Sequence, residues 1–251
     1  MRQLEHFPNV VAMFLARAGE KGDAPFLWTK LKGEWRSISW RDAAEKVARL
    51  ASALKRLGLV RGDRVMLVAE NRPEWLISDL AIMAAGCVTV PTYTTNMERD
   101  HQHILDDSGA RAVIVSTQKL AKTLLPAAVR TSACEHAIII ESMPAGQTGT
   151  LQIHDWTSLI AAETAHPDVG AAATNFRRED LACIIYTSGT GGAPRGVMQH
   201  HGALLHNVEG CTAVIAEDFG WGDETWRDDV RGPLDACEAE RIFHGLPLVD
   251  L

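Results

Sequence analysis

A glycine-rich stretch between residues 186 and 196 carries the plainest chemistry in the sequence. It reads Tyr-Thr-Ser-Gly-Thr-Gly-Gly-Ala-Pro-Arg-Gly. Glycines let backbone N–H groups approach an anion without a Cβ in the way, and successive N–H groups in such turns form an anion-binding concavity. Thr187, Ser188 and Thr190 add hydroxyl donors, and Arg195 adds a permanently charged planar guanidinium. The composition favours a loop that holds a polyphosphate, with a surface turn that binds nothing as the alternative.

The stretch matches neither of two familiar phosphate-binding motifs. A Walker loop requires G-x-x-x-x-G-K-[ST], and no Lys-Ser or Lys-Thr pair follows such glycines here. The dinucleotide fingerprint G-x-G-x-x-G begins at Gly189, but Pro194 occupies its last position. Phosphate binding at this stretch would therefore use a different motif.

Alternating strands and helices precede the stretch and would position it. Short apolar runs without polar alternation predict parallel strands that are covered on both faces, over residues 64–69, 87–90, 112–115, 136–140 and 181–186. Apolar residues at helical spacing predict helices over 9–18, 40–57, 73–85, 98–107, 118–130, 155–162 and 201–216. A hairpin is predicted from 26–28 and 35–38, an Ala-rich connector over 161–174, and a short apolar step at 197–198.

This alternation predicts an α/β fold with a doubly wound, mostly parallel sheet flanked by helices. Ligands of such sheets bind beyond the carboxyl ends of the strands. The glycine-rich stretch follows the predicted strand 181–186 directly. Its position therefore favours phosphate binding over a surface turn without a ligand.

Composition and charge limit the classes of partner. The chain has 251 residues, 46% hydrophobic and 23% charged, as in ordinary globular proteins. The net charge of −7 is concentrated in residues 217–241, which contain nine acidic residues and three arginines. Residues 1–216 are formally neutral. Because nucleic-acid backbones and anionic lipids attract basic surfaces, we expect no nucleic-acid partner.

The apolar runs and the cysteines of the sequence predict where in the cell the protein is located. The longest apolar region, residues 75–90, is interrupted by Ser78, Asp79 and Gly86, so no transmembrane helix is predicted. The five cysteines, at 87, 134, 183, 211 and 237, form no C-x-x-C pair. They suit buried thiols in a reducing cytosol, and we expect a cytoplasmic protein.

Histidines at two places raise further alternatives. Three histidines lie at or near the start of a predicted helix and suggest a metal site: His200, His201 and His206. No carboxylate stands at a matching offset, so we expect no metal there. His101 and His103 are predicted to be solvent-exposed near a helix start.

The stretch at 186–196 resembles the phosphate-binding signature of adenylate-forming enzymes, Tyr-Thr-Ser-Gly-Thr-Thr-Gly-x-Pro-Lys-Gly. Three upstream blocks are similar to those of long-chain fatty acyl-CoA synthetases: Gly-Asp-Arg-Val at 62–65, Asn-Arg-Pro-Glu-Trp at 71–75 and Ala-Gly-Cys-Val-Thr-Val-Pro-Thr-Tyr at 85–93. The resemblance runs from about residue 9 to residue 217. Gly191 departs from the usual Thr, and Arg195 departs from the usual Lys.

The resemblance implies ATP-dependent activation of a long-chain fatty acid through acyl-AMP to acyl-CoA, with ATP, coenzyme A and Mg²⁺. It implies that the β- and γ-phosphates of ATP are contacted by Thr187, Ser188, Gly189, Thr190, Gly191, Gly192 and Arg195. It assigns no catalytic residue and no Mg²⁺ ligand within this chain. Peripheral membrane contact and the oligomeric state stay open.

The family's later segments do not occur among these residues. They are Tyr-Gly-x-Thr-Glu, Thr-Gly-Asp and a lid domain with a catalytic Lys. We therefore expect residues 1–216 to be a partial AMP-binding N-terminal domain that is inactive alone. Residues 217–251 are expected to be a divergent acidic tail arising by insertion, frameshift or truncation. The alternatives are a nucleotide-binding pseudoenzyme and a non-functional remnant. A luciferase-like or peptide-synthetase adenylation domain fits the blocks less well.

Overall fold

The computed structural model of the chain describes residues 6–142, 146–163, 175–187 and 193–219. The chain divides into two compact units. One unit, His6–Ala203, holds an α/β body. The described part of the other, residues 204–219, continues helix α8 (His201–Phe219).

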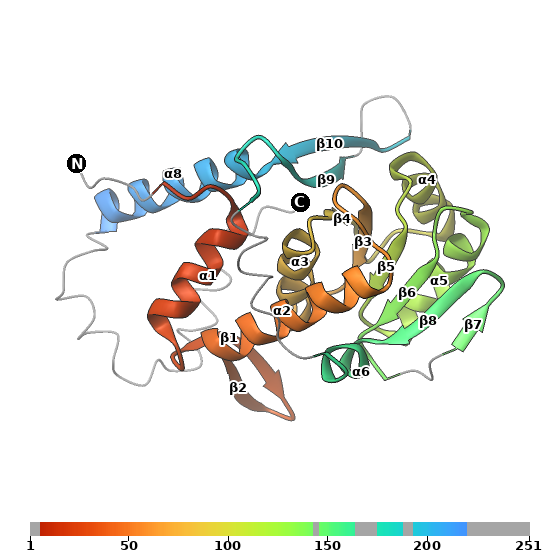
Figure 1. The fold of residues 1–251 in the computed structure, drawn as a ribbon, viewed down its shortest axis with the longest axis horizontal. Helices are drawn as coiled ribbons and strands as arrows, with labels where there is room; N and C mark the ends of the chain where they lie inside the picture. Colours follow the sequence, from red (N-terminus) through yellow and green to blue (C-terminus); the bar gives the residue numbers. More distant parts are fainter. Residues whose placement is uncertain (1–5, 143–145, 164–174, 188–192, 220–251) are drawn as a thin grey trace. The chain divides into compact units, whose positions relative to one another are not determined.

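An eight-stranded sheet forms the centre of the α/β body (Figure 1). Its strands run in the order β10 (Arg195–His200), β9 (Leu181–Thr187), β4 (Val88–Pro91), β3 (Arg64–Val68), β5 (Ala112–Val115), β6 (His136–Ile139), β8 (Leu151–Asp155) and β7 (Gly146–Thr148). The strands from β9 to β8 are parallel, and the edge strands β10 and β7 are antiparallel to their neighbours. The prediction of a mostly parallel sheet is therefore confirmed.

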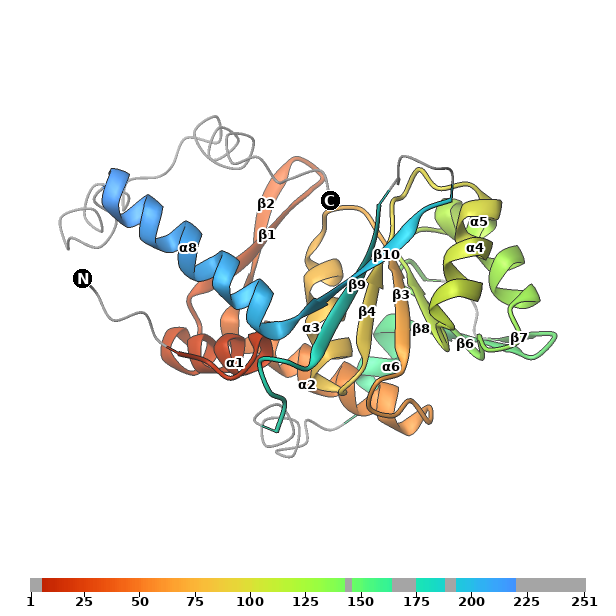
Figure 2. The ribbon, with the colours of Figure 1, turned by 90° about the horizontal axis from the view of Figure 1, so that it is seen from above.

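Helices cover both faces of this sheet (Figure 2). On one face α4 (Glu98–Ser108) packs beside α5 (Gln118–Arg130). On the other face α2 (Trp40–Arg56) packs against α3 (Pro73–Ala84) and α6 (Trp156–Ala161). Helix α1 (Val10–Lys21) packs on α2 and α3, and β1 (Pro25–Leu31) pairs with β2 (Glu34–Ser39) in a separate hairpin.

Local sequence explains most of these elements. Side chains of Asn9, Ser39, Thr117 and Asp155 accept hydrogen bonds from the first turns of α1, α2, α5 and α6, as N-caps do. Pro73 opens α3, where the missing N–H costs nothing. The central strands are buried on both faces, because helices lie on either side.

Two strand pairings differ from the prediction. The segment at 197–198 is not a short step between the loop and a helix but the middle of β10, which pairs with β9 over its whole length. The β7–β8 hairpin was not predicted at all. Both segments are rich in polar residues or glycine, so their own propensity for strands is weak, and a neighbouring strand supplies the hydrogen bonds. Residues 164–174 of the predicted connector lie outside the described residues.

The thiols of three cysteines lie in the interior. Burial raises the pKa of Cys87, Cys134 and Cys183 to about 12 in each case, so these thiols stay protonated and are poor nucleophiles. Cys211 is exposed. In the described part of the chain, no helix has both the length and the apolarity to cross a membrane.

Candidate phosphate-binding site

The two ends of the glycine-rich stretch are the stems of a β-hairpin. Thr187 ends β9 and Arg195 begins β10, and the two residues are register partners across the antiparallel ladder. Directly opposed residues in such a ladder point to the same face. Both side chains are exposed. A hydroxyl donor and a cation therefore lie together where the chain enters and leaves the loop.

The loop itself lies outside the described residues. These are Ser188, Gly189, Thr190, Gly191 and Gly192, five of the seven residues predicted to contact phosphate. The structure places the other two, Thr187 and Arg195. Among the described residues no carboxylate pairs with the Arg195 guanidinium, so its charge is available to an anion.

Strand β9 delivers the loop to the carboxyl edge of the sheet. Its parallel neighbour is β4, through the pair Thr89 and Cys183. The residues that follow β4, Thr92 and Tyr93, therefore lie at the same edge as Thr187. The Thr92 hydroxyl is buried and has no hydrogen-bond partner among the described residues. The predicted position of the stretch, at the end of a parallel strand, is confirmed.

Helix α4 contacts both stems. Before the loop, the Tyr186 hydroxyl donates to the Asp107 carboxylate, with 2.5 Å between the two oxygens. After the loop, His103 Nε2 lies 2.9 Å from the Pro194 carbonyl oxygen. A carbonyl oxygen can only accept, so His103 carries its proton on Nε2. The two helix residues are four positions apart and so share one face of α4.

The Tyr186 ring, next to the stem residue Thr187, lies in the core. It is 5% exposed and belongs to the apolar cluster between the sheet and helices α4 and α5. Burial, together with the neighbouring Asp107 carboxylate, raises the pKa of Tyr186 far above its usual range. The hydroxyl therefore remains a donor at any physiological pH.

Gly196 makes room for this ring. It is the register partner of Tyr186. A Cβ at position 196 would lie 2.8 Å from Ile184 Cγ2 and 3.1 Å from the Tyr186 ring. The last glycine of the stretch therefore serves packing at the stem, a role that sequence reasoning missed.

The prediction that His101 and His103 are solvent-exposed was wrong. His101 is 1% exposed, and burial lowers its pKa. His103 is half-buried, and its ring stands edge-on to that of Tyr186 with the centroids 6.4 Å apart. Polar positions on a short helix suggest exposure, but this helix packs against α5 and makes hydrogen bonds to both stems.

No metal centre is evident in the part of the chain that the structure describes. There, no three His, Cys, Asp or Glu side chains gather closely enough to hold an ion. His201, part of the considered histidine cluster, is instead buried against Phe176.

Comparisons with known proteins identify the family of the chain. The family described as AMP-binding enzyme matches residues 14–236. The chain belongs to the AMP-binding enzyme family. The glycine-rich stretch of this AMP-binding enzyme, residues 186–196, lies within the residues that the family matches.

Sequence relatives of this AMP-binding enzyme include fatty acyl-CoA ligases. Long-chain-fatty-acid–CoA ligase FadD15 of Mycobacterium tuberculosis is 30% identical over 205 residues, which are 82% of this chain and 33% of the ligase. Long chain acyl-CoA synthetase 7, peroxisomal, of Arabidopsis thaliana is 32% identical over 196 residues, covering 74% of this chain and 27% of the synthetase. The chain thus spans about a third of the length of these relatives or less.

A solved structure shares the fold. The anthranilate CoA ligase AuaEII in complex with anthranoyl-AMP superposes with a TM-score of 0.68 at 25% identity, over 79% of this chain and 36% of that one. The fold of the α/β body is therefore that of the adenylation N-terminal domains of acyl-CoA ligases.

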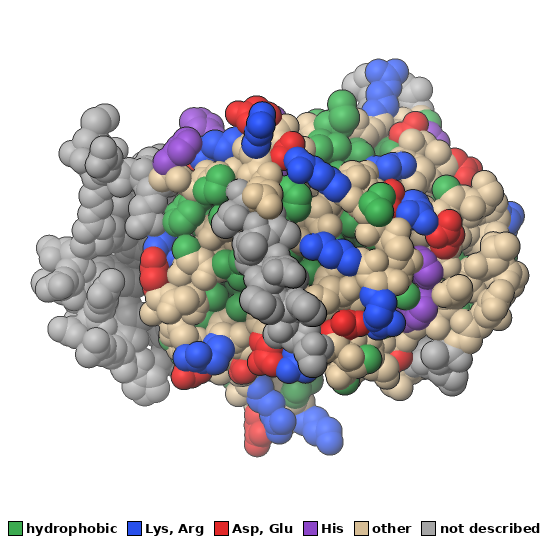
Figure 3. All heavy atoms as spheres, in the orientation of Figure 1, with side chains coloured by type: hydrophobic (Ala, Val, Ile, Leu, Met, Phe, Trp, Pro, Cys, Tyr) green, Lys and Arg blue, Asp and Glu red, His purple; other side chains and the backbone are tan. Residues whose placement is uncertain are grey.

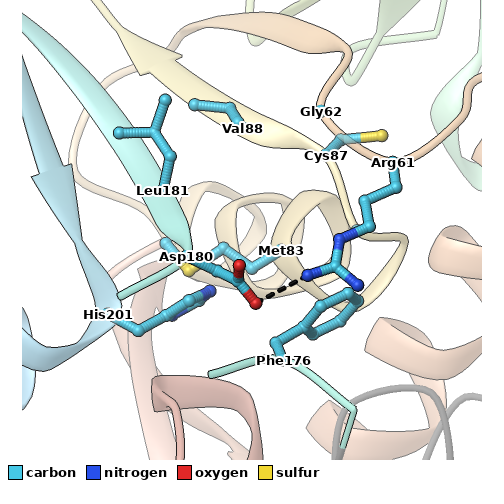
Figure 4. A pocket seen from close by; sticks show the side chains of 10 residues that line it. Arg61, Gly62, Met83, Cys87, Val88, Phe176, Asp180, Leu181 and His201 are labelled. Atoms are coloured by element: carbon cyan, nitrogen blue, oxygen red, sulfur yellow. Dashed lines mark hydrogen bonds and ion pairs between the residues drawn. The ribbon is translucent and has the colours of Figure 1, made fainter. Parts of the chain in front are cut away.

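A hollow of about 210 Å³ lies at the opposite end of the strands from the loop (Figure 4). Its lining includes residues at the amino ends of β3, β4 and β9, namely Gly62, Val88 and Leu181. Across it Arg61 Nη2 donates to Asp180 Oδ2 at 2.6 Å. The hollow is separated from Thr187 and Arg195 by the length of the sheet, so it takes no part in the candidate site.

Figure 3 shows one face of the molecule, on which Lys and Arg side chains alternate with Asp and Glu. On this face, the coloured side chains of the described residues form no continuous basic surface. The expectation of no nucleic-acid partner stays a prediction.

Proposed function

We propose that this AMP-binding enzyme chain binds the β- and γ-phosphates of ATP at the glycine-rich loop, in the service of fatty-acid activation. The observation that supports it most is the pairing of Thr187 with Arg195 at the carboxyl edge of the sheet. The fatty-acid class rests on the relatives that are named long-chain acyl-CoA ligases. Activation would join the carboxylate to the α-phosphate with release of pyrophosphate, and coenzyme A would then displace AMP.

The chain's own residues would bind and orient the leaving pyrophosphate. Arg195 would donate N–H groups to phosphate oxygens, and its charge would stabilise the negative charge that builds up as the bond to the α-phosphate breaks. The Thr187 hydroxyl would donate from the opposite stem. Loop residues 188–192 would add backbone N–H groups, as the family signature implies.

The cofactor proposal includes Mg²⁺ and coenzyme A. Magnesium commonly binds through substrate phosphates with one or two carboxylates. The described residues provide no cluster of ligands for it. We propose that Mg²⁺, when bound with ATP, would neutralise part of the phosphate charge beside Arg195 and Thr187.

The first test is nucleotide affinity. We expect Arg195→Gln to raise the Kd for MgATP at least about tenfold, since a charge-assisted hydrogen bond contributes about 1.5–3 kcal/mol. Arg195→Lys should retain much of the affinity. Arg36→Gln is the matched control, because Arg36 is an exposed arginine on the separate β1–β2 hairpin. Isothermal titration calorimetry gives these constants, and an unchanged Kd in Arg195→Gln would contradict the proposal.

A second test separates binding from turnover. We propose that the 251-residue chain binds MgATP but has little ligase turnover by itself, since it spans 33% of the FadD15 ligase. Pyrophosphate release should not rise when a long-chain fatty acid is added to the purified chain. Release that depends on fatty acid would overturn this part of the proposal, whereas binding without release also agrees with a nucleotide-binding chain that performs no chemistry.

A further inference from the structure

The strongest unexplained arrangement is that one helix contacts the chain on both sides of the glycine-rich loop. Asp107 bonds Tyr186, immediately before the stem residue Thr187, and His103 bonds Pro194, immediately before Arg195. The partners of these bonds are 79 and 91 residues apart in sequence. Such long-range side-chain bonds to both stems are not required by the sheet, whose ladder already pairs β9 with β10.

From this geometry we infer that α4 is the element that positions the two stems on which the glycine-rich loop is carried, with His103 and Asp107 as positioning residues. The inference rests on the proposed function, because it concerns how the same loop meets phosphate. Neither residue is assigned a contact with the phosphates. Each acts through the stem residue beside its bond.

Helix α4 is itself fixed to the sheet, so it can act as a support. Arg64, the first residue of β3, donates from Nε to the Ser108 carbonyl at 2.6 Å and from Nη2 to the Gly109 carbonyl at 2.9 Å. Gly109 ends α4 in the left-handed conformation, with φ of 60°. A Cβ there would lie 2.7 Å from Arg64 Nη2. The carboxyl end of α4, next to Asp107, is thereby held by the central strand of the sheet.

Two of the interacting side chains, His103 and Tyr186, also contact each other. The His103 and Tyr186 rings meet at an interplanar angle of 86°. Gly196 lets the Tyr186 ring lie against β10. A glycine-rich loop loses much conformational entropy when it orders around an anion. Stems held in place from outside reduce that loss, because fewer residues remain to be ordered on binding.

The test compares three variants with a matched control on the same helix. Tyr186→Phe removes the hydroxyl, and His103→Phe removes the donor to Pro194. His103→Gln keeps an N–H that can reach a carbonyl. Gln102→Ala is the control, because Gln102 lies on α4 but bonds Asp106 and Thr131 on the side of α5.

Two measurements are made on the full chain: the Kd for MgATP by calorimetry, and hydrogen exchange of the backbone amides of residues 187–196. We expect Tyr186→Phe and His103→Phe each to raise the Kd about threefold to tenfold and to speed exchange in the loop. His103→Gln should recover at least half of the lost affinity. Gln102→Ala should change neither quantity, even where it lowers the Tm.

The outcomes separate the two proposals. If wild-type protein binds MgATP and the stem variants bind equally well with unchanged exchange, the positioning role is overturned and the proposed function stands. If wild-type protein does not bind MgATP but exchange in the loop still depends on His103 and Tyr186, the proposed function fails and the positioning role of α4 is supported. If Gln102→Ala weakens binding as much as His103→Phe, the effect is general to α4 and the specific role of His103 is overturned.

Discussion

At the scale of single residues, Asp79 shows how the interior changes a carboxyl group. It lies on α3, half-buried, near Thr89 of β4 and Cys183 of β9. Burial raises the pKa of Asp79 to about 6, and the Thr89 hydroxyl acts in the opposite direction. The charged form is thus disfavoured in the folded protein relative to the unfolded chain, where an Asp has a pKa of about 3.9.

The expected consequence is a stability penalty above the folded pKa. As pH rises from about 4 through 6, the unfolded state gives up its proton first, and the free energy of unfolding falls. Asp79→Asn should therefore raise the free energy of unfolding at pH 7.5 by on the order of 1–3 kcal/mol and change it little at pH 4. Urea unfolding at both values measures this, and equal effects at both would contradict the assignment.

His201 has the opposite dependence on pH. It is 3% exposed at the start of α8, and its Nδ1 has no partner among the described residues. Burial lowers the pKa of His201 to about 4, although Asp180 acts to raise it, and His200 lowers it slightly further. Neutral His201 stabilises the fold above the unfolded pKa of about 6.5, and this contribution is lost as pH falls toward 4.

We expect the free energy of unfolding of the wild-type protein to fall by on the order of 3 kcal/mol between pH 6.5 and pH 4 because of His201. His201→Phe, which keeps a ring beside Phe176, should show a correspondingly weaker loss in thermal or urea unfolding. The exposed His206 provides the control His206→Gln. Parallel pH profiles of His201→Phe and wild-type protein would rule out this role.

At the scale of elements, the hairpin β9–β10 depends on a glycine for its packing. Because a Cβ at position 196 would meet Ile184 and Tyr186, Gly196→Ala must shift one of them. Overpacking of this kind destabilises a protein by about 1–3 kcal/mol, and displacement of Tyr186 should also weaken MgATP binding.

The matched control for that variant is Gly19→Ala. Gly19 lies within α1, and a Cβ there would have no other atom within 4 Å, so Ala should stabilise the helix by up to about 1 kcal/mol. The Tm and the Kd of both variants check the prediction. A Gly196→Ala protein as stable and as tight-binding as wild type would show that β10 moves aside without consequence.

At the scale of the whole molecule, one buried apolar cluster lies within the α/β body. The cluster of buried residues between the sheet and helices α4 and α5 runs from Met66 to Tyr186. We propose that residues 1–216 form the domain and that residues 217–251 are a separate acidic tail. The family match, by comparison, extends to residue 236.

A chain ended after Ala216 should therefore unfold cooperatively with a Tm within a few degrees of the full chain, since a loss of about 1 kcal/mol lowers the Tm by only about 2–4 °C in a domain of this size. Differential scanning calorimetry on both chains gives the comparison. Aggregation or non-cooperative unfolding of the shorter chain would mean that the tail contributes to the fold.

Much of this fold could be predicted from local sequence, because its causes are local. Apolar runs set the parallel strands, and Ser39 and Pro73 mark the starts of α2 and α3. The glycine-rich loop is recognisable from its composition alone, as is its place after a buried strand. Strand β10 was missed because its residues become a strand only beside β9.

The sequence by itself determined which residues we propose for phosphate binding, since backbone N–H groups, hydroxyls and a guanidinium are properties of residue type. Only the tertiary structure decided what supports them. His103 and Asp107 look like ordinary polar positions of a surface helix until α4 is placed beside stems 91 and 79 residues away. The raised pKa of Asp79 and the burial of His101 likewise depend on neighbours from other elements. Burial and long-range hydrogen bonds are properties of packing, and no window of sequence contains them.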